Sequence, residues 1–441
     1  MDMKRTGRPL GPHHIGDALL AVDGVAIRVR QERCAKVRNR NVACLRCADA
    51  CTSGCISFGD GELRVAPERC VGCGTCATVC PTCALEAVNP TDAALAAACL
   101  ATRRPMGEDA PRDEVCVVCS QVEAALGDLL DPAAYAGVVC AGRVDESLVC
   151  RLAAEGAGRV TVVCGRCDRC AQRHGRDTAE LVAATARVLL EAWGGDCEVV
   201  VAGEVPATAL RGGADEAAEA ARRLEAFFAV ERACAPIRLA GDAGVRADEA
   251  VGCADVAPGG DRPAGMAERD DDHGPGMRFY WGSTHTRRVG RSMHVMKDGT
   301  LPHFVPDRRE RLLDALAALG EPQRDQVDCR LWGTIVIDAT RCTSCRMCST
   351  FCPTGAIRRF DDEDGAMGVE HLPGDCVKCG SCRDICPADA ISLLDGVRTS
   401  YLMDGGRHRY VMTPRAVSLT DNPHQILDTM RQSFNGDIFE R

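Results

Sequence analysis

Short apolar runs alternate with longer amphipathic segments over residues 112–232. The runs are rich in valine, which is typical of buried strands in a parallel sheet. The segments between them have helical length and helical periodicity. Strands that alternate with helices favour right-handed βαβ units, so this region is predicted to be an α/β domain with a parallel sheet. The predicted strands are 137–140, 160–163 and 199–202, and the predicted helices are 145–155, 178–193 and 214–230.

The pattern changes several times outside this domain. One stretch is rich in glycine, alanine, aspartate and proline with almost no apolar periodicity, which predicts a flexible linker. Scattered arginines follow, and then leucines recur on one face of a predicted helix over 307–319, which ends at Gly320. The predicted organisation is 28–90 and 330–395 for two cysteine-rich modules, 112–232 for the α/β domain, 235–276 for the linker, 277–329 for a basic, helical connector and 396–441 for a polar C-terminal tail.

Composition excludes some classes of protein. The chain has 441 residues, 46% of them hydrophobic, which is enough for several domains with apolar cores. Its net charge of −10 and its aromatic content of 4% are unlike a nucleic-acid-binding protein, which needs a basic surface and stacking residues. No signal-peptide pattern and no run of about twenty apolar residues is visible. We therefore expect a cytoplasmic protein without a transmembrane segment.

Thirty cysteines are the strongest chemical signal in the chain. Dense disulfide frameworks belong mainly to small secreted domains, so metal ligation in a reducing compartment is the better interpretation. Two runs near the C-terminus share the spacing C-x2-C-x2-C-x3-C-P. This spacing lets a short loop direct three thiolates at one [4Fe–4S] cluster, while the fourth, which precedes proline, reaches a second cluster. The runs are Cys342, Cys345, Cys348, Cys352 and Cys376, Cys379, Cys382, Cys386.

An isolated C-x2-C pair is as typical of structural zinc as of iron. Here whole four-cysteine runs repeat with identical gaps and end in Cys-Pro, which favours iron–sulfur clusters over zinc. Residues 330–395 resemble the bacterial two-cluster ferredoxins, and that resemblance implies crossed ligation. It implies that Cys342, Cys345, Cys348 and Cys386 hold one cluster and that Cys352, Cys376, Cys379 and Cys382 hold the other.

The N-terminal cysteine-rich module repeats this pattern with one irregular run. Its regular run is Cys70, Cys73, Cys76 and Cys80, followed by Pro81. Upstream, the segment after Cys51 aligns with the segment after Cys352, which makes Cys51 a fourth ligand. Cys44 and Cys47 are then the second and third ligands, and the first would fall at Asn41, which cannot bind iron.

Two cysteines compete for this missing position. Cys34 could loop back over a basic stretch, and Cys55 is its rival. If neither one is a ligand, a site with three cysteines would hold a [3Fe–4S] or labile cluster. With Cys34, the predicted sets are Cys34, Cys44, Cys47, Cys80 and Cys51, Cys70, Cys73, Cys76, so the chain is predicted to hold four [4Fe–4S] clusters.

More cysteines lie near the predicted strands of the α/β domain, where such folds usually place ligands. They are either core residues or ligands of one further [2Fe–2S] or other metal centre, and their convergence on one sheet edge favours a metal. Residues 139–145, together with Cys164, Cys170 and His174, resemble the delta (iron–sulfur) subunit of hydrogenases that work with heterodisulfide reductase. The resemblance implies a [2Fe–2S] cluster, and Cys167 departs from that family's pattern. The candidates are Cys116, Cys119, Cys140, Cys164, Cys167 and Cys170.

Together these patterns predict an α+β multidomain protein, with two ferredoxin-like 2[4Fe–4S] modules flanking a small α/β parallel-sheet domain. The predicted function is one-electron transfer between a donor and a redox partner, such as a hydrogenase or a heterodisulfide-reductase-like complex. No flavin fingerprint is visible, so we expect any flavin on the partner. One alternative is an oxidoreductase with a reductive site in the α/β domain, although no acid–base or nucleophile constellation is legible there. A cluster-based redox sensor is another.

Overall fold

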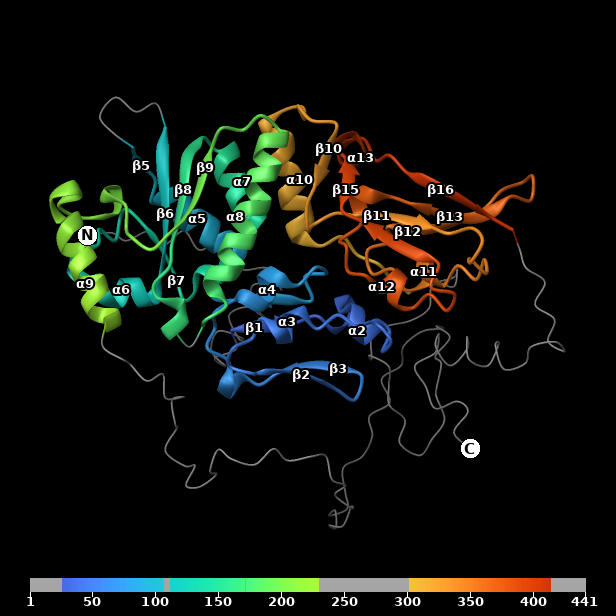
Figure 1. Cartoon of the computed structure of the whole chain (residues 1–441), viewed down its shortest axis with the longest axis horizontal. Coiled ribbons are helices and arrows are strands. Elements are labelled where there is room, and N and C mark those ends of the chain that lie inside the picture. The colour runs from blue at the N-terminus through green and yellow to red at the C-terminus, as the bar shows by residue number, and fades with distance from the viewer. Residues whose placement is uncertain (1–25, 107–111, 171, 230–300, 414–441) are drawn as a thin grey trace, which may run out of the picture.

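The computed structural model describes residues 26–106, 112–170, 172–229 and 301–413. Figure 1 shows the N-terminal module in blue, the α/β domain in cyan and green, and the C-terminal module in orange and red. The predicted linker, the first part of the connector and the end of the tail lie outside the described residues. In the part of the chain that is described, no helix combines the length and the apolar character that a membrane crossing needs.

The N-terminal module consists of short elements around its cysteines. Its first strand pairs antiparallel with its last, and a hairpin with a turn at Asp60 and Gly61, both of positive φ, lies between them. The helices are one turn long, so they gain little stability from their own hydrogen bonds. The elements are β1 (Ile27–Val29), α2 (Ala35–Arg38), α3 (Arg46–Asp49), β2 (Ile56–Gly59), β3 (Glu62–Val65), α4 (Thr75–Val79) and β4 (Leu85–Ala87).

The central domain contains a five-stranded sheet around β6. Four strands are parallel in the order β7-β6-β8-β9, and β5 pairs antiparallel with β6. Because the chain moves to one side of β6 for β7 and to the other for β8, a topological switch point lies beside the carboxyl end of β6. The strands are β5 (Arg104–Pro105), β6 (Asp113–Cys119), β7 (Ala136–Val138), β8 (Ala157–Val163) and β9 (Glu198–Ala202).

The sequence pattern missed β6, although this strand is central. Cys116 and Cys119 lie before the first predicted strand, 137–140, but they belong to a strand of their own. Alternation along β6 serves two cores, because Val115 and Val117 face one helix layer and Cys116 and Val118 face the other. The first layer consists of α5 (Asp92–Ala101), α7 (Glu146–Ala154) and α8 (Gly175–Ala192), and the second of α6 (Ser120–Leu126) and α9 (Ala217–Ala229).

The C-terminal module repeats the plan of the N-terminal one. β11 pairs antiparallel with β14, and a hairpin of β12 and β13 is extended by β16. Residues 396–412, which the sequence assigns to a tail, form β15, α13 and β16 and so belong to this fold. The elements are β10 (Gln326–Asp328), β11 (Thr334–Ile337), α11 (Met347–Thr350), β12 (Ile357–Asp361), β13 (Met367–His371), α12 (Ser381–Asp384), β14 (Ile391–Leu394), β15 (Gly396–Arg398), α13 (Thr399–Met403) and β16 (His408–Met412).

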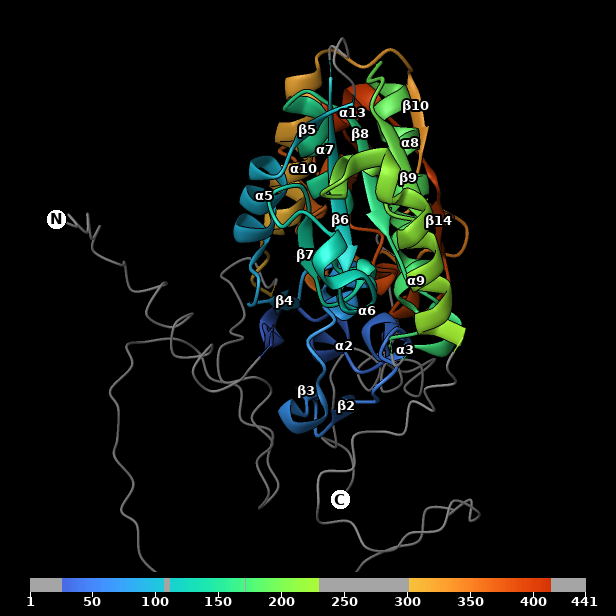
Figure 2. The same ribbon diagram turned by 90° about the vertical axis from the view of Figure 1, so that its left-hand side faces the viewer.

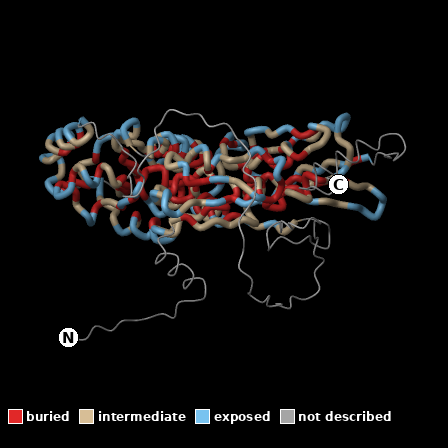
Figure 3. Tube along the Cα trace, turned by 90° about the horizontal axis from the view of Figure 1, so that it is seen from below, coloured by how far each residue is buried: buried red, intermediate tan, exposed pale blue. Residues whose placement is uncertain are grey.

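Helix α10 (Asp307–Leu319) joins the α/β domain to the C-terminal module. It has the bounds that the leucine pattern predicts, and it packs against α7. Leu312, Leu316 and Trp332 are at most 2% exposed and share one apolar core with α7 and α8. Figure 3 shows buried residues continuing from one region into the next. The second half of the predicted connector is therefore part of a core.

The two cysteine-rich modules also touch each other. Ala35 and Val42 of the first pack against Ile385 of the second. The backbone N–H of Ala43 donates a hydrogen bond to the Asp384 carboxylate at 2.9 Å. Figure 2 shows the N-terminal module below the lower ends of β6 and β8. The modules flank the α/β domain along the sequence, but in space they are neighbours.

Candidate metal centres

Four thiols of the C-terminal module line the same small cavity, of about 20 Å³. Burial raises the pKa of Cys348, and the charges of the other three thiols raise it further. Several thiolates this close together require a positive charge among them, so the group fits a metal cluster. The cavity is lined by Cys342, Cys345, Cys348 and Cys386, with Ile337, Ile391 and Met412 among its apolar walls.

A second group in this module combines one thiol of the first run with three of the second. Burial raises the pKa of Cys379 to about 12 and that of Cys376 to about 11, and the charge of Cys352 raises both. Burial also raises the pKa of Cys382, as do the charges of the same three thiols. The thiols of the two runs are thus crossed, as the resemblance to two-cluster ferredoxins implies.

The regular runs share a backbone conformation that directs their thiols inward. Left-handed residues between the cysteines make tight turns, which bring cysteines three positions apart to the same side. The N–H groups of Ser344 and Lys378 donate to Cys342 Sγ and Cys376 Sγ, each at 3.5 Å. Such bonds stabilise thiolate charge and tune a bound cluster. The residues with positive φ are Gly72 and Gly74, Ser344 and Arg346, and Lys378 and Gly380.

A third group lies in the N-terminal module, beside α4. Burial raises the pKa of Cys76 well above its usual value. The charges of Cys73, Cys47, Cys70 and Cys51 raise it further. Cys51, Cys70, Cys73 and Cys76 are the set that the sequence predicts, and Cys47 belongs to the neighbouring group.

The fourth group contains Cys34. The pKa of Cys47 is raised to about 12 by burial and by the charges of Cys80, Cys34 and Cys44. That of Cys34 is raised to about 11 by burial and by Cys80 and Cys44. These four thiols therefore lie together, and Cys34 stands beside Cys44 and Cys47, where the irregular run lacks its first cysteine.

Cys55 lies in a different place. Its Sγ is 3.4 Å from Cys51 Sγ, in the third group. Its carbonyl accepts a hydrogen bond from Ala66 N–H at 2.8 Å, as the carbonyl of Ala356 accepts one from Leu372 N–H at 2.7 Å. Cys55 therefore occupies the position that alanine holds in the C-terminal module.

The described ranges contain no three Cys, His, Asp or Glu side chains close enough to hold a single metal ion. A structural zinc ion needs four ligands at about 2.0–2.3 Å from one point. The four thiolates of a cubane bind different irons, so they lie farther apart.

Cysteines also gather at the switch point of the α/β sheet. Cys119 ends β6, Cys140 follows β7, and Cys164 follows β8 directly. A hydrogen bond with Cys164 lowers the pKa of Cys167 to about 7 and raises that of Cys164, which the charge of Cys119 raises further. Burial and the charges of Cys73 and Cys167 raise the pKa of Cys140 to about 12.

The other two candidate cysteines, Cys116 and Cys170, have different surroundings. Cys116 packs in the apolar core with Val118 and Leu126, because strand alternation turns it beneath the helices of the second layer. We therefore assign Cys116 to the core. Cys170 Sγ lies 2.9 Å from Gln172 Oε1, to which it donates a hydrogen bond.

The switch-point cysteines adjoin the N-terminal module. Thr75 Oγ1 donates to Cys140 Sγ at 4.0 Å, and the charge of Cys73 acts on Cys140. Within that module, the charge of Cys47 acts on Cys76, so the third and fourth groups are also neighbours.

The series continues into the C-terminal module. Arg38 of α2 donates to the carbonyl of Cys352 at 3.4 Å, across the contact between modules. The charge of Cys348 acts on Cys382, so the two thiol groups of the C-terminal module adjoin each other. The order is the switch-point cysteines, then Cys51/Cys70/Cys73/Cys76, Cys34/Cys44/Cys47/Cys80, Cys352/Cys376/Cys379/Cys382 and Cys342/Cys345/Cys348/Cys386.

Four buried arginines border these groups: Arg143, which pairs with Asp92, and three others. Arg38, Arg308 and Arg309 are 3%, 8% and 6% exposed. Burial lowers the pKa of Arg38 and of Arg309 to about 10, so both stay protonated at neutral pH. Burial also disfavours charge on Arg308, but neighbours that include Cys83, Asp145 and Glu146 outweigh it and raise its pKa. Nothing in the sequence separates these arginines from ordinary surface ones.

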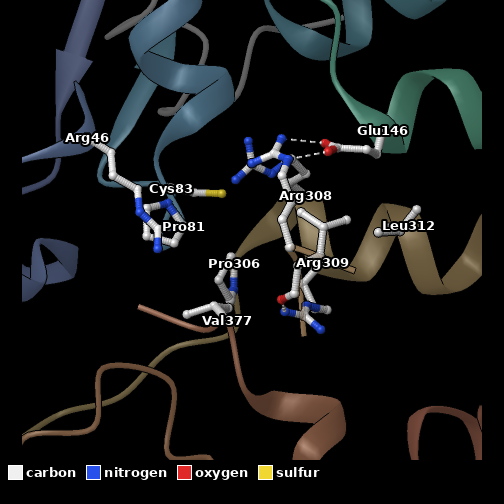
Figure 4. Close-up of a pocket in the computed structure, with 11 residues that line it drawn as sticks. Arg46, Pro81, Cys83, Glu146, Pro306, Arg308, Arg309, Leu312 and Val377 are labelled. Carbon is white, nitrogen blue, oxygen red and sulfur yellow. Dashed lines mark hydrogen bonds and ion pairs between the residues drawn. The ribbon is translucent and has the colours of Figure 1, made fainter. Parts of the chain in front are cut away.

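Arg308 and Arg309 line a small cavity of about 20 Å³ where the three regions meet. Figure 4 shows Arg308 on the side of Cys83 and Arg309 on the side of Val377. The dashed lines mark the ion pair between Arg330 and Glu146, at 2.6 and 2.9 Å.

A wide cleft of about 750 Å³ opens beside the switch-point cysteines. Cys164 and Cys167 form part of its wall, and helix α9 contributes Leu224 and Phe228. Its lining carries four arginines and three acidic residues, a slight basic excess, although the chain as a whole is acidic. The arginines are Arg166, Arg169, Arg173 and Arg176, and the acidic residues are Asp168, Asp177 and Glu225.

Comparisons with known proteins agree with this geometry. Family models match a 4Fe-4S binding domain at residues 63–86 and a 4Fe-4S dicluster domain at 341–390. A third matches the delta subunit of methyl-viologen-reducing hydrogenase at residues 131–227. The chain carries two ferredoxin-type iron–sulfur domains and a hydrogenase delta-subunit domain. Iron–sulfur clusters are the cofactors of such ferredoxin domains, and the role they support is electron transfer.

Curated relatives match only short stretches. The electron transport protein HydN of Escherichia coli is 48% identical over 42 residues, which is 10% of this chain and 24% of HydN. An iron–sulfur protein of Rhodospirillum rubrum is 29% identical over 70 residues, 16% of this chain and 33% of that protein. The chain thus spans between a quarter and a third of the relatives it matches. No solved structure matches it.

Proposed function

We propose that this chain relays single electrons through four [4Fe–4S] clusters and one further centre in the α/β domain. The single-file order of the thiol groups carries the proposal, because each group adjoins the next. A cluster changes its charge by one electron with little rearrangement. The chain's own residues bury the thiolates, exclude water and supply N–H donors to sulfur.

The proposed ligand sets follow the thiol groups. In this proposal Cys34 completes the irregular site. The charges of Cys80 and Cys44 raise its pKa, and its own charge raises the pKa of Cys47. Cys55 is a packing residue beside the neighbouring site. The C-terminal ligands are crossed as in two-cluster ferredoxins.

The fifth centre is proposed at the switch point. Cys119, Cys140 and Cys164 meet there from three strands, and Cys167 is hydrogen-bonded to Cys164. The resemblance to the hydrogenase delta subunit favours a [2Fe–2S] cluster, for which Cys170 is another nearby candidate ligand. This centre would form the end of the series that is nearest the basic cleft.

The proposed partner is a redox protein such as a hydrogenase or a heterodisulfide-reductase-like complex, with any flavin on that partner. The delta-subunit domain and the likeness to HydN support this assignment. The basic cleft next to Cys164 and Cys167 offers a docking surface for an acidic partner.

Iron analysis and electron paramagnetic resonance on anaerobically reconstituted protein test the proposal. The four cubanes should contribute about sixteen irons per chain, with a further two from a [2Fe–2S] centre. Spin–spin interaction between reduced clusters should broaden the spectra, because neighbouring groups are adjacent. Zinc in place of iron, or fewer than about eight irons, would contradict the proposal.

A further inference from the structure

Two buried guanidinium groups reach the same thiol group from different elements. Arg38 of the N-terminal module donates to the carbonyl of Cys352 at 3.4 Å. Arg309 of α10 donates to the carbonyl of Cys376 at 2.7 Å and stacks on Trp332, with its Cζ 4.4 Å from the ring centroid. Both therefore adjoin the set Cys352, Cys376, Cys379 and Cys382.

Neither guanidinium has an acidic partner among the described residues. There Arg38 and Arg309 form no ion pair with a carboxylate, and their hydrogen bonds go to backbone carbonyls. A buried cation without a counter-ion is destabilising. The nearby negative charges are thiolates: Cys352 and Cys379 act on Arg38, and Cys376 on Arg309.

The other buried or half-buried arginines beside thiol groups differ in this respect. Arg308 is close to Asp145 and Glu146. Arg346, in the loop of the last group, pairs with Asp361 at 2.7 Å. Arg143, beside α4, pairs with Asp92 at 2.5 Å. Of these five arginines, the two without a nearby carboxylate adjoin the same thiol group.

We propose that the cluster held by Cys352, Cys376, Cys379 and Cys382 has the highest reduction potential of the four, because Arg38 and Arg309 are its counter-ions. This inference rests on the proposed function, in which that site holds a cluster. Reduction adds one negative charge to the cluster and its thiolates. A buried positive charge nearby stabilises the more negative state, which raises the potential.

The position of this cluster gives the potential a role. It stands at the contact between the two modules. It is the third of the four cubane groups, after Cys51/Cys70/Cys73/Cys76 and Cys34/Cys44/Cys47/Cys80. An electron that enters from either end comes to rest there. The chain then stores one electron at the junction before passing it on.

Redox titration with dithionite, followed by electron paramagnetic resonance, tests the inference on Arg38→Met and Arg309→Met variants of the full chain. In each variant the first [4Fe–4S] cluster to be reduced should become harder to reduce by at least tenfold. This corresponds to about 59 mV for one electron. The other signals should keep their potentials. Arg309→Lys, which retains the charge, should recover most of the loss.

Arg346→Met is the matched control, because its guanidinium also adjoins a thiol group but is paired with Asp361. It should leave the first-reduced signal unchanged. If both Met variants retain about sixteen irons and that signal does not move, the inference is wrong while the electron-transfer proposal stands.

If an arginine variant loses iron, Cys379→Ser in the otherwise unchanged chain tests which cluster has the highest potential. This substitution should alter or remove the signal of highest potential. If another signal changes instead, a different cluster is the electron store and the inference is overturned. Wild-type protein without cubane signals would contradict the proposed function itself, which is a separate outcome.

Discussion

Arg308 and Arg309 are consecutive on α10, yet they serve different modules. Arg308 donates to the carbonyls of Thr78, at 2.7 Å, and of Cys80. Arg309 donates to the carbonyl of Cys376. Successive residues on a helix differ in direction by about 100°, since there are 3.6 residues per turn. One helix thereby fixes a ligand loop of each module, and with it the spacing between the two.

Replacing Arg308 should loosen the N-terminal module. Arg308→Met would leave the carbonyls of Ala77, Thr78 and Cys80 without this donor and remove the positive charge beside Asp145. We expect a loss of about 3 kcal/mol in the free energy of unfolding. Thermal bleaching of the cluster absorbance would measure it.

Arg311→Met provides the comparison on the same helix. Its side chain is 30% exposed and pairs with Asp92. Its loss should cost about 1 kcal/mol or less, because partly exposed ion pairs contribute little. Equal losses in the free energy of unfolding would mean that the contacts of Arg308 contribute no more than the partly exposed ion pair of Arg311.

The Cys34 assignment is tested by two serine variants. Cys34→Ser should lose up to about four irons per chain, or convert one cubane to a three-iron form, because a ligand is missing. Cys55→Ser should retain the full iron content, since Cys55 holds the position of Ala356. Iron analysis with spin quantitation decides between them, and the reverse outcome would make Cys55 the ligand.

The fifth centre should need the switch-point cysteines, and it should not need Cys116 in the interior of β6. Cys140→Ser is expected to abolish the [2Fe–2S] signal while about sixteen cubane irons remain. Cys116→Ser should preserve this signal, because Cys116 packs in the core. Electron paramagnetic resonance on mildly reduced protein is the measurement. Loss of the signal in Cys116→Ser alone would refute our assignment.

His371 should make the C-terminal module sensitive to acid. Its ring is fully buried, both ring nitrogens lack a partner among the described residues, and burial lowers its pKa to about 3. The unfolded chain binds this proton near pH 6.5, so stability is complete above that pH and falls as the pH drops toward 3. The loss should be roughly 2 kcal/mol between pH 7 and pH 5.

Thermal bleaching at several pH values would show this slope in the wild type and a smaller one in His371→Leu. His174→Gln, at a side chain that is 41% exposed, should leave the slope unchanged. An unaltered slope in His371→Leu would show that other groups cause the acid sensitivity.

The basic cleft should accelerate electron exchange with acidic partners. The double variant Arg173→Glu and Arg176→Glu reverses two charges beside Cys167. With an acidic two-cluster ferredoxin as the probe, its exchange rate at low salt should fall by about tenfold. Stopped-flow kinetics would measure this. Arg222→Glu, outside the cleft on α9, should have little effect, and equal slowing in both would indicate a general charge effect.

Much of this molecule is predictable from local patterns. Identical gaps between cysteines predict the ferredoxin-type domains, because most ligands of a cluster lie within one short loop and are therefore close together in the sequence. Helix 307–319 is likewise legible, since an amphipathic helix needs only a stripe of leucines. Strand β6 was missed because two cysteines interrupt its valines and suggested ligands instead.

The sequence by itself therefore determined the kind of cofactor and the segments that bind it. Only the tertiary structure decided which cysteine lies beside Cys44, Cys47 and Cys80, how the thiol groups follow one another, and that Arg38 and Arg309 meet at one of them. Ligand spacing is a local property of a few neighbouring residues. The approach of Arg38 to Cys352, 314 positions away, depends on how whole modules pack, which no short pattern encodes.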